Sequence, residues 1–175
     1  MGIQEGSHKI GPDNGSLTVK TGREGAASKA GHNLTLEATS WEGTVEVGDS
    51  ASVELSVDPS GIEVSSGEGG AKPLGDDEKG DIKKSMDDKV LGSDKITFQS
   101  SEADFSSGNV KGDLSIAGQS NSVEIPLDVG DDGTVKGSVT LSQDDYGIKQ
   151  FKALMGALKV SDAVEVHIEA KLPTD

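Results

Sequence analysis

The residues best suited to chemistry in this sequence are the carboxylates of an acidic stretch, DVGDDG, at residues 128–133. Ca²⁺ prefers closely spaced carboxylate oxygens, and Asp128, Asp132 and Gly133 match the start of an EF-hand loop. Gly130 supplies no side-chain oxygen, however, and Val139 stands where such a loop requires a bidentate glutamate. The stretch therefore predicts a solvated hairpin turn rather than a metal site.

The sequence also offers few residues suited to nucleophilic catalysis or to zinc binding. The chain has no cysteine, and its three histidines, His8, His32 and His167, lack the spacing of zinc ligands. Serines are abundant, but none stands in a Gly-x-Ser-x-Gly elbow between a strand and a helix. We therefore expect no catalytic residues, no metal and no cofactor, and a protein that binds rather than catalyses.

The dominant pattern is a strict alternation of apolar and polar side chains. In NLTLEA, for example, Leu34, Leu36 and Ala38 share one face and polar residues the other. One apolar and one polar face is typical of antiparallel strands with one side in water, and many such strands predict a sandwich or a closed barrel of about eight strands. The alternation recurs at residues 17–19, 34–38, 53–57, 62–64, 96–98, 114–116, 123–129, 135–141 and 164–172.

The apolar face changes parity once near the middle of this pattern. Ala38 is on an even-numbered face, whereas Trp41, Val45 and Val47 are on an odd-numbered one. A strand can absorb such a change with one extra residue in a β-bulge. The sequence therefore predicts a bulge near residues 41–43.

Two segments follow a helical period instead. Ile82, Met86 and Val90 lie four residues apart, which predicts a short amphipathic helix over 79–91 that ends at Gly92. Apolar residues at helical spacing predict a second helix over 147–158. The fold class is thus all-β with one or two short helical insertions.

Composition limits the partners and the domain organisation. The formal net charge of -15 argues against binding to nucleic acid, because like charges repel phosphate backbones. No stretch is long and apolar enough to span a bilayer, and the polar start of the chain does not resemble a signal peptide. We expect a flexible segment over 1–15 and one domain over 16–173, as a monomer or homodimer. Its expected location is the cytoplasm, or outside it if a leader has been removed.

Several blocks, in their order and spacing, resemble the YceI-like family. The aromatic-Gly-Ile signature is similar at Tyr146, Gly147 and Ile148, and the first half of the opening hairpin ends on a histidine at His32. The resemblance extends over residues 16–173. It implies a lipocalin-like, elongated antiparallel barrel whose apolar lumen binds polyisoprenoid lipids. The other similar blocks are SVELSVDPSGIEV, GDIKKSMDDKVLGSDKITFQSS and GDLSIAGQSNSVEIPLDV.

The chain also departs from the family pattern at two places. Gln143 stands where the family often has an arginine, and the hairpin at 118–121 lacks a basic residue. Either cation would suit an anionic head group, so its absence favours a neutral apolar ligand, such as an isoprenoid-like, quinone-like or fatty-acyl lipid.

Candidate ligand-binding residues follow from the inward parity of the strands. Alternation alone favours a packed interior, whereas the family resemblance implies a lumen. Two polar residues, His32 and Tyr146, would join the apolar lining and contact a head group or a carbonyl. The apolar candidates are Leu34, Leu36, Leu55, Phe98, Leu114, Ile116, Ile125, Val139, Leu141, Val166 and Ile168.

Lipid binding or transport in the lumen is accordingly the function that the sequence favours. One alternative is an interaction protein with a packed barrel and an acidic partner-binding surface. Another is an enzyme acting on a lipid in the lumen, with His32 and Tyr146 as its polar groups, although no second catalytic group is identifiable.

Overall fold

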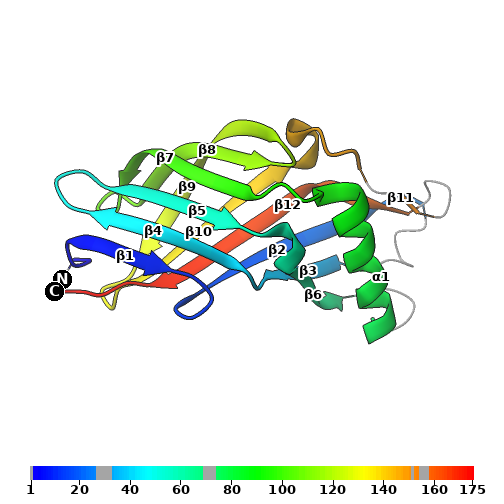
Figure 1. Cartoon of the computed structure of the whole chain (residues 1–175), viewed down its shortest axis with the longest axis horizontal. Helices are drawn as coiled ribbons and strands as arrows, with labels where there is room; N and C mark the ends of the chain where they lie inside the picture. The colour runs from blue at the N-terminus through cyan, green and yellow to red at the C-terminus, as the bar shows by residue number, and fades with distance from the viewer. Residues whose placement is uncertain (1, 27–32, 69–73, 151, 154–157) are drawn as a thin grey trace.

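The chain folds into an elongated molecule around one curled sheet, as the computed structural model in Figure 1 shows. The strands run along the long axis, and helix α1 (Asp76–Met86) crosses one end. The two chain termini lie together at the opposite end. The structure describes residues 2–26, 33–68, 74–150, 152–153 and 158–175.

The alternating segments of the sequence form the strands. These are β1 (Gly6–Ile10), β2 (Gly15–Glu24), β3 (Asn33–Ala38), β4 (Trp41–Val47), β5 (Ser52–Val57), β6 (Ile62–Glu68), β7 (Ile96–Asp104), β8 (Asn109–Ile116), β9 (Gln119–Val129), β10 (Thr134–Ser142), β11 (Lys152–Ala153) and β12 (Leu158–Lys171). Three short helical turns accompany them: η2 (Pro59–Gly61), η3 (Asp87–Leu91) and η4 (Gln143–Tyr146).

All strand pairs in the described part of the chain are antiparallel, which confirms the predicted fold class. The order of neighbours is β1-β4-β5-β7-β8-β9-β10-β12-β2-β3-β6, with β11 beside β12. The prediction of a closed barrel of about eight strands is wrong. Within the described residues the sheet holds twelve strands, and its end strands β1 and β6 are not paired with each other. The sheet curls into a half-barrel instead.

A bend that divides two long strands accounts for part of the larger strand number, and β1 and β11, which no alternating segment predicts, account for the rest. Only Thr39 and Ser40 separate β3 from β4, and η2 and its N-cap Asp58 separate β5 from β6. Two backbone hydrogen bonds cross this bend, from Thr39 N to Gly61 O at 2.8 Å and from Asp58 N to Ser40 O at 2.9 Å. Two neighbouring strands therefore bend together and keep their antiparallel pairing on both sides.

The same bend explains the change of parity. Ala38 and Trp41 are both buried, at 7% and 5% exposure, while Thr39 and Ser40 between them are exposed. The predicted change of face is thus confirmed, but it occurs at Thr39–Ser40 and not in a bulge at residues 41–43. The change of buried face is therefore produced by two exposed residues between the strands and not by a β-bulge.

The first predicted helix is confirmed and the second is wrong. Helix α1 continues through the π-helical turn η3 and ends at Gly92, whose φ of 66° is left-handed. In the region 147–158, by contrast, the described residues include the strand β11 and the start of β12, which pair with each other. Backbone pairing with the sheet overrides the helical spacing there, and Ile148 packs with strand residues.

The first residues also differ from the expected flexible segment over 1–15. Strand β1 pairs with β4, from Gly6 opposite Val47 to Ile10 opposite Gly43. Ile10 is buried in the core at 6% exposure. A strand with one buried apolar side chain has no apolar–polar alternation to reveal it in the sequence.

The acidic stretch forms the hairpin turn between β9 and β10, as predicted. The carboxylate of Asp132 accepts hydrogen bonds from Thr134 N at 3.0 Å and lies 2.9 Å from Lys171 Nζ. The hydrogen bond from Lys171, followed by those from Thr134, holds the pKa of Asp132 well below its usual range. This carboxylate therefore stabilises the turn.

Outside the region that α1 covers, the inner face of the sheet is tightly packed, and a glycine makes this packing possible. Leu55, Phe98 and Leu114 lie side by side on β5, β7 and β8, with Phe98 only 4% exposed. A methyl group added at Gly112 would lie 2.3 Å from Gln99 O and 2.8 Å from Phe98 Cζ. Neither contact is sterically allowed, so β8 approaches β7 this closely only with glycine.

Gly112→Ala should therefore lower the free energy of unfolding by about 1–3 kcal/mol through overpacking. Gly80→Ala is the matched control, because Gly80 is exposed in α1 with nothing within 4 Å of the added methyl group. There alanine should stabilise the helix by up to about 1 kcal/mol. Urea unfolding followed by the fluorescence of Trp41 measures both. Equal stabilities of the two variants would contradict this account of the packing.

Candidate ligand-binding site

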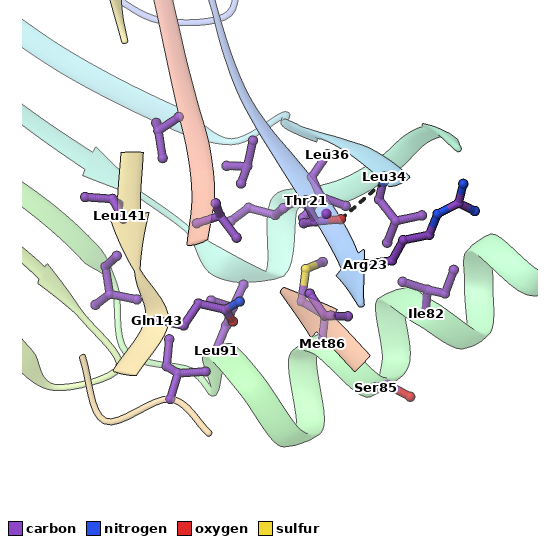
Figure 2. A pocket seen from close by; sticks show the side chains of 18 of the residues that line it. Thr21, Arg23, Leu34, Leu36, Ile82, Ser85, Met86, Leu91, Leu141 and Gln143 are labelled. Carbon is purple, nitrogen blue, oxygen red and sulfur yellow. Dashed lines mark hydrogen bonds between the residues drawn. The ribbon is translucent and has the colours of Figure 1, made fainter. Parts of the chain in front are cut away.

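A cavity of about 530 Å³ lies between the inner face of the sheet and helix α1 (Figure 2). Its volume falls in the range of small-molecule sites, about 300–1,000 Å³. Most of the side chains that line it are apolar: Val19, Leu34, Leu36, Ile62, Leu74, Ile82, Met86, Leu91, Ile96, Ile116, Leu141, Ile148, Val160, Val164 and Val166. The cavity therefore offers a ligand mainly hydrocarbon contacts.

Adjacent strands form one wall of the cavity through their register. Val166 of β12 lies opposite Val19 of β2, which in turn lies opposite Leu36 of β3. Directly opposed residues of antiparallel strands project from the same face of the sheet. The three side chains thus form a continuous apolar row, and Leu36 is the most buried of them at 8% exposure.

Helix α1 forms the opposite wall. Ile82 and Met86 are four residues apart and so share one face of the helix. Figure 2 shows both side chains directed toward the strands, whereas Ser85 is directed away from them. Leu91 extends this apolar face into η3. The apolar side of the helix therefore covers the cavity, and polar residues of α1, Glu78 and Asp81, lie at the border of the lining.

Two lysines fasten the helix to the sheet: Lys79 Nζ donates to Ser65 O of β6 at 3.4 Å, and Lys83 makes the shorter contacts. The ammonium group of Lys83 donates hydrogen bonds to Ser60 O at 2.7 Å and Ile62 O at 3.1 Å, beside the bend between β5 and β6. It also lies 3.0 Å from the carboxylate of Asp87, one turn further along the helix. The position of α1 over the cavity thus depends on backbone carbonyls of the bend.

Charged side chains in the described lining occur in equal numbers of each sign. Arg23 and Lys159 are cations, and Glu78 and Asp81 of α1 are anions. Their formal charges cancel. The lining therefore has no excess of positive charge with which to attract a phosphate or a carboxylate.

Turn η4 closes another side of the cavity and is fastened to β12. The hydroxyl of Ser142 donates a hydrogen bond to the carboxylate of Asp162, which also accepts from Asp144 N at 2.9 Å. Gln143, which lines the cavity, donates from Nε2 to Ser161 O at 3.0 Å. These bonds fix the direction in which the side chains of η4 point.

Two further contacts complete this turn. The side-chain amide of Asn121 on β9 donates to Asp145 O at 2.6 Å. Gly147 then ends the turn with φ of 69° and donates from its N–H to Gln143 O and Asp144 O. Only glycine adopts this left-handed conformation without strain. The Tyr-Gly-Ile signature therefore has a physical role, since it places Tyr146 and Ile148 in the interior on either side of a tight turn.

The phenol of Tyr146 is the most unusual polar group of the cavity. The residue is 3% exposed, and its hydroxyl has no hydrogen-bond partner among the described residues. Burial first, and the negative charge of Asp145 second, raise the pKa of this phenol above its ordinary value. Tyr146 therefore presents a neutral O–H donor in apolar surroundings, where hydroxyl groups ordinarily have a partner.

Comparison with known proteins agrees with this geometry. The family model described as YceI-like domain matches residues 10–172. The chain belongs to the YceI-like family. No protein of curated function matches its sequence. The helix that covers the interior and the Tyr-Gly-Ile turn therefore belong to a YceI-like domain.

Solved structures show the same fold at low sequence identity. BcnA of Burkholderia cenocepacia superposes with a TM-score of 0.62 at 15% identity, covering 89% of this chain and 94% of BcnA. A polyisoprenoid binding domain from Saccharophagus degradans, implicated in plant cell wall breakdown, gives 0.61 at 11% identity and covers 97% and 100%. The YCEI protein of Campylobacter jejuni gives 0.53 at 12% identity and covers 80% and 84%. The curled antiparallel sheet is thus shared across these proteins.

In this YceI-like chain the cavity brings together about half of the residues that the sequence placed in a lumen. These are Leu34, Leu36, Ile116, Leu141, Val166 and Tyr146. His32, the other polar candidate, lies outside the described residues.

The remaining candidates lie outside the lining of this cavity. Leu55, Phe98 and Leu114 form the packed row on β5, β7 and β8, and Val139 packs in the cluster of Leu141 and Tyr146. Ile125 and Ile168 face Gly137, where an added methyl group would lie 3.1 Å and 3.3 Å from them. The interior of the domain is thus packed in part and hollow beneath α1.

Several lining residues were missing from the sequence prediction. Ile82, Met86 and Leu91 come from α1 and η3, a segment that the sequence predicts as a helix but that contributed no residue to the predicted lining. Their helical spacing already indicated an apolar face in need of a partner. Val164 shares its parity with Val166 and could have been included on that basis.

Tyr146 should titrate above the ordinary pKa of tyrosine, about 10. Since it is the only tyrosine, the tyrosinate absorbance reports on this residue alone. The folded protein holds the phenolic proton more tightly than the unfolded chain does. The contribution of Tyr146 to the free energy of unfolding is therefore fully present below the pKa of the unfolded chain. It is lost as the pH rises from the unfolded pKa through the higher folded pKa.

Denatured protein is the control and should titrate near 10. Tyr146→Phe should show no tyrosinate transition and should lose less stability above pH 10 than the wild type. A folded midpoint at or below that of the denatured chain would contradict the burial of this phenol.

Proposed function

We propose that this YceI-like chain binds one apolar lipid, with a prenyl or acyl chain, in the cavity beneath α1 and transports the lipid while it is bound there. The observation behind the proposal is the predominantly apolar lining of a cavity of about 530 Å³. The printed name of the S. degradans relative, a polyisoprenoid binding domain, supports the same class of ligand.

The energetics are sufficient without any polar contact. Each CH₂ group transferred from water to an apolar site contributes about 0.8 kcal/mol, so ten of them would contribute roughly 8 kcal/mol. A net free energy of that size corresponds to a dissociation constant near 1 μM, although the cost of immobilising the lipid reduces it. A longer chain would offset that cost by burying more methylene groups.

Helix α1 is the element that we propose to control access. It forms a wall of the cavity with Ile82 and Met86, and hydrogen bonds of one side chain, Lys83, join it to carbonyls of the bend. Displacing it would expose the cavity without disturbing any strand pairing. Release of the lipid would then require the loss of these contacts, of the hydrogen bond from Lys79 Nζ to Ser65 O, and of the packing of Met86.

The alternative of a packed interaction protein is less well supported. In a packed protein, side chains would fill the whole interior of the curled sheet, as they do around Phe98. The cavity beneath α1 has instead an apolar lining on both walls. Lipid carriage accounts for this lining, whereas a partner-binding acidic surface does not.

Filling the cavity should abolish binding. Val166→Phe adds volume to the apolar row, and we expect the affinity for geranylgeraniol, a neutral prenyl alcohol, to fall by about tenfold or more, equivalent to 1.4 kcal/mol. Titration calorimetry measures the affinity. Native mass spectrometry of the purified wild-type protein, with organic extraction, tests independently for lipid that it has retained.

Val129→Phe is the matched control. Val129 is also half-buried in the interior but is absent from the lining. This variant should bind geranylgeraniol as the wild type does, after both variants have been checked for folding by urea unfolding. The proposal fails if wild-type protein neither retains nor binds any apolar lipid, or if Val166→Phe binds as tightly as wild type.

Loosening α1 should speed release. Lys83→Met keeps the apolar stem but removes the hydrogen bonds to Ser60 O and Ile62 O. The two lost bonds contribute about 0.5–1.5 kcal/mol each, or about 1–3 kcal/mol together, so dissociation of a bound fluorescent fatty alcohol should become about fivefold faster or more. Stopped-flow fluorescence measures this rate. Lys84→Met, at the exposed neighbouring position, should leave it unchanged; equal rates for both variants would argue against α1 as the gate.

A further inference from the structure

The hydroxyl of Tyr146 has an unmet need for a hydrogen bond. Tyr146 lines the cavity and is 3% exposed, its hydroxyl oxygen is buried, and none of the described residues provides a partner for it. Its neighbours in the same cluster, Leu141 and Ile148, are apolar. A phenylalanine would fill the same space without leaving a polar group unsatisfied, so packing alone does not account for the hydroxyl.

We propose that Tyr146 determines ligand specificity by donating a hydrogen bond to an uncharged oxygen of the lipid, such as a carbonyl, ether or hydroxyl oxygen. This inference rests on the proposed function and adds the chemical class of the ligand. The cavity would then select neutral, oxygenated lipids over pure hydrocarbons and over anionic lipids.

The donor is held in place before any ligand binds. Turn η4 is fixed by Asn121, which donates to Asp145 O at 2.6 Å, and by Asp162, which accepts from Asp144 N at 2.9 Å. Gly147 closes the turn immediately after the tyrosine. A polar group that is positioned by the fold binds its partner with less loss of conformational freedom than one on a mobile loop.

The phenol is a donor because it stays protonated. Burial and the nearby carboxylate of Asp145 both disfavour the phenolate. The partner that this hydroxyl needs is therefore an acceptor oxygen, which a hydrocarbon does not have.

The lining gives no preference for an anionic acceptor. The cations Arg23 and Lys159 are matched by the anions Glu78 and Asp81, and the whole chain carries a net charge of -15. Gln143, next to the tyrosine in η4, is neutral and its Nε2 donates to Ser161 O. A carboxylate or phosphate would lose its hydration at this point without gaining a compensating charge.

The experiment compares three saturated ligands of equal chain length: a methyl ketone, the alkane and the fatty carboxylate, each delivered from cyclodextrin. Wild-type protein should bind the ketone most tightly. Tyr146→Phe should weaken ketone binding about tenfold, which corresponds to 1.4 kcal/mol, and should leave alkane binding unchanged. The carboxylate should bind wild type more weakly than the ketone does.

Infrared spectroscopy of a ¹³C-labelled ketone carbonyl provides a second readout. Its stretch should shift to lower frequency in wild type and not in Tyr146→Phe. Ile148→Ala is the matched control, because it removes apolar contact from the same cluster and keeps the hydroxyl. That variant should weaken ketone and alkane binding equally and should retain the shift.

The outcomes distinguish the failure of the proposed lipid binding from the failure of the proposed role of Tyr146. If none of the three ligands binds to wild type, the proposed function fails. If ketone and alkane bind equally to wild type, or if Tyr146→Phe weakens both alike without a change in the carbonyl stretch, lipid binding stands and the role of Tyr146 is overturned. Tightest binding of the carboxylate would overturn the preference for uncharged ligands.

Discussion

The paired bend between β3–β4 and β5–β6 is the constraint from which the rest of the architecture follows. Hydrogen bonds from Thr39 to Gly61 and from Asp58 to Ser40 let two neighbouring strands bend at the same level. Beyond the bend, β3 and β6 continue beside β2, while β4 and β5 continue beside β1 and β7. One sheet thereby turns its apolar face inward along its whole length, and the carbonyls beside the bend hold Lys83 of α1.

The interior that results has two parts with different roles. Outside the region that the helix covers, Phe98 packs against β8 over Gly112, and Ile125 and Ile168 both contact the space over Gly137. Beneath the helix no such filling occurs, and the side chains of α1 face those of β2 and β3 across a cavity. The packed part stabilises the sheet, which leaves the hollow part free to be shaped for a ligand.

The sequence predicts the inward face of each strand but not how far the opposite wall is. Leu36 and Val166 line the cavity, while Phe98 and Ile168 have the same inward orientation and are packed. Phe98 and Ile168 are packed because each lies beside a glycine of a neighbouring strand, Gly112 or Gly137. Which residue lies beside which glycine depends on the register of the strands. Alternation excludes a slip of one residue, but it does not identify which residues of neighbouring strands lie opposite each other.

The errors over 147–158 and at the barrel closure have related causes. The apolar Ile148 is buried by packing against Leu141 and Tyr146 and not on one face of a helix, because Gly147 ends the turn η4 immediately before it. Strand number depended on bends at polar residues, Thr39 and Ser40, whose exposure could not be distinguished from that of an ordinary outward face. Both features depend on tertiary contacts that no local pattern contains.

The adjacency of the two chain ends determines where the domain could be joined to another protein. Ile3 bridges to Thr174, and Asp175 N donates to Gly2 O, at the end of the molecule remote from α1 (Figure 1). Because the ends are adjacent, the domain is geometrically suited to insertion into a loop of another protein, or to circular permutation. A module or surface attached there would hold the domain by its base, with the helix-covered opening pointing away from the point of attachment.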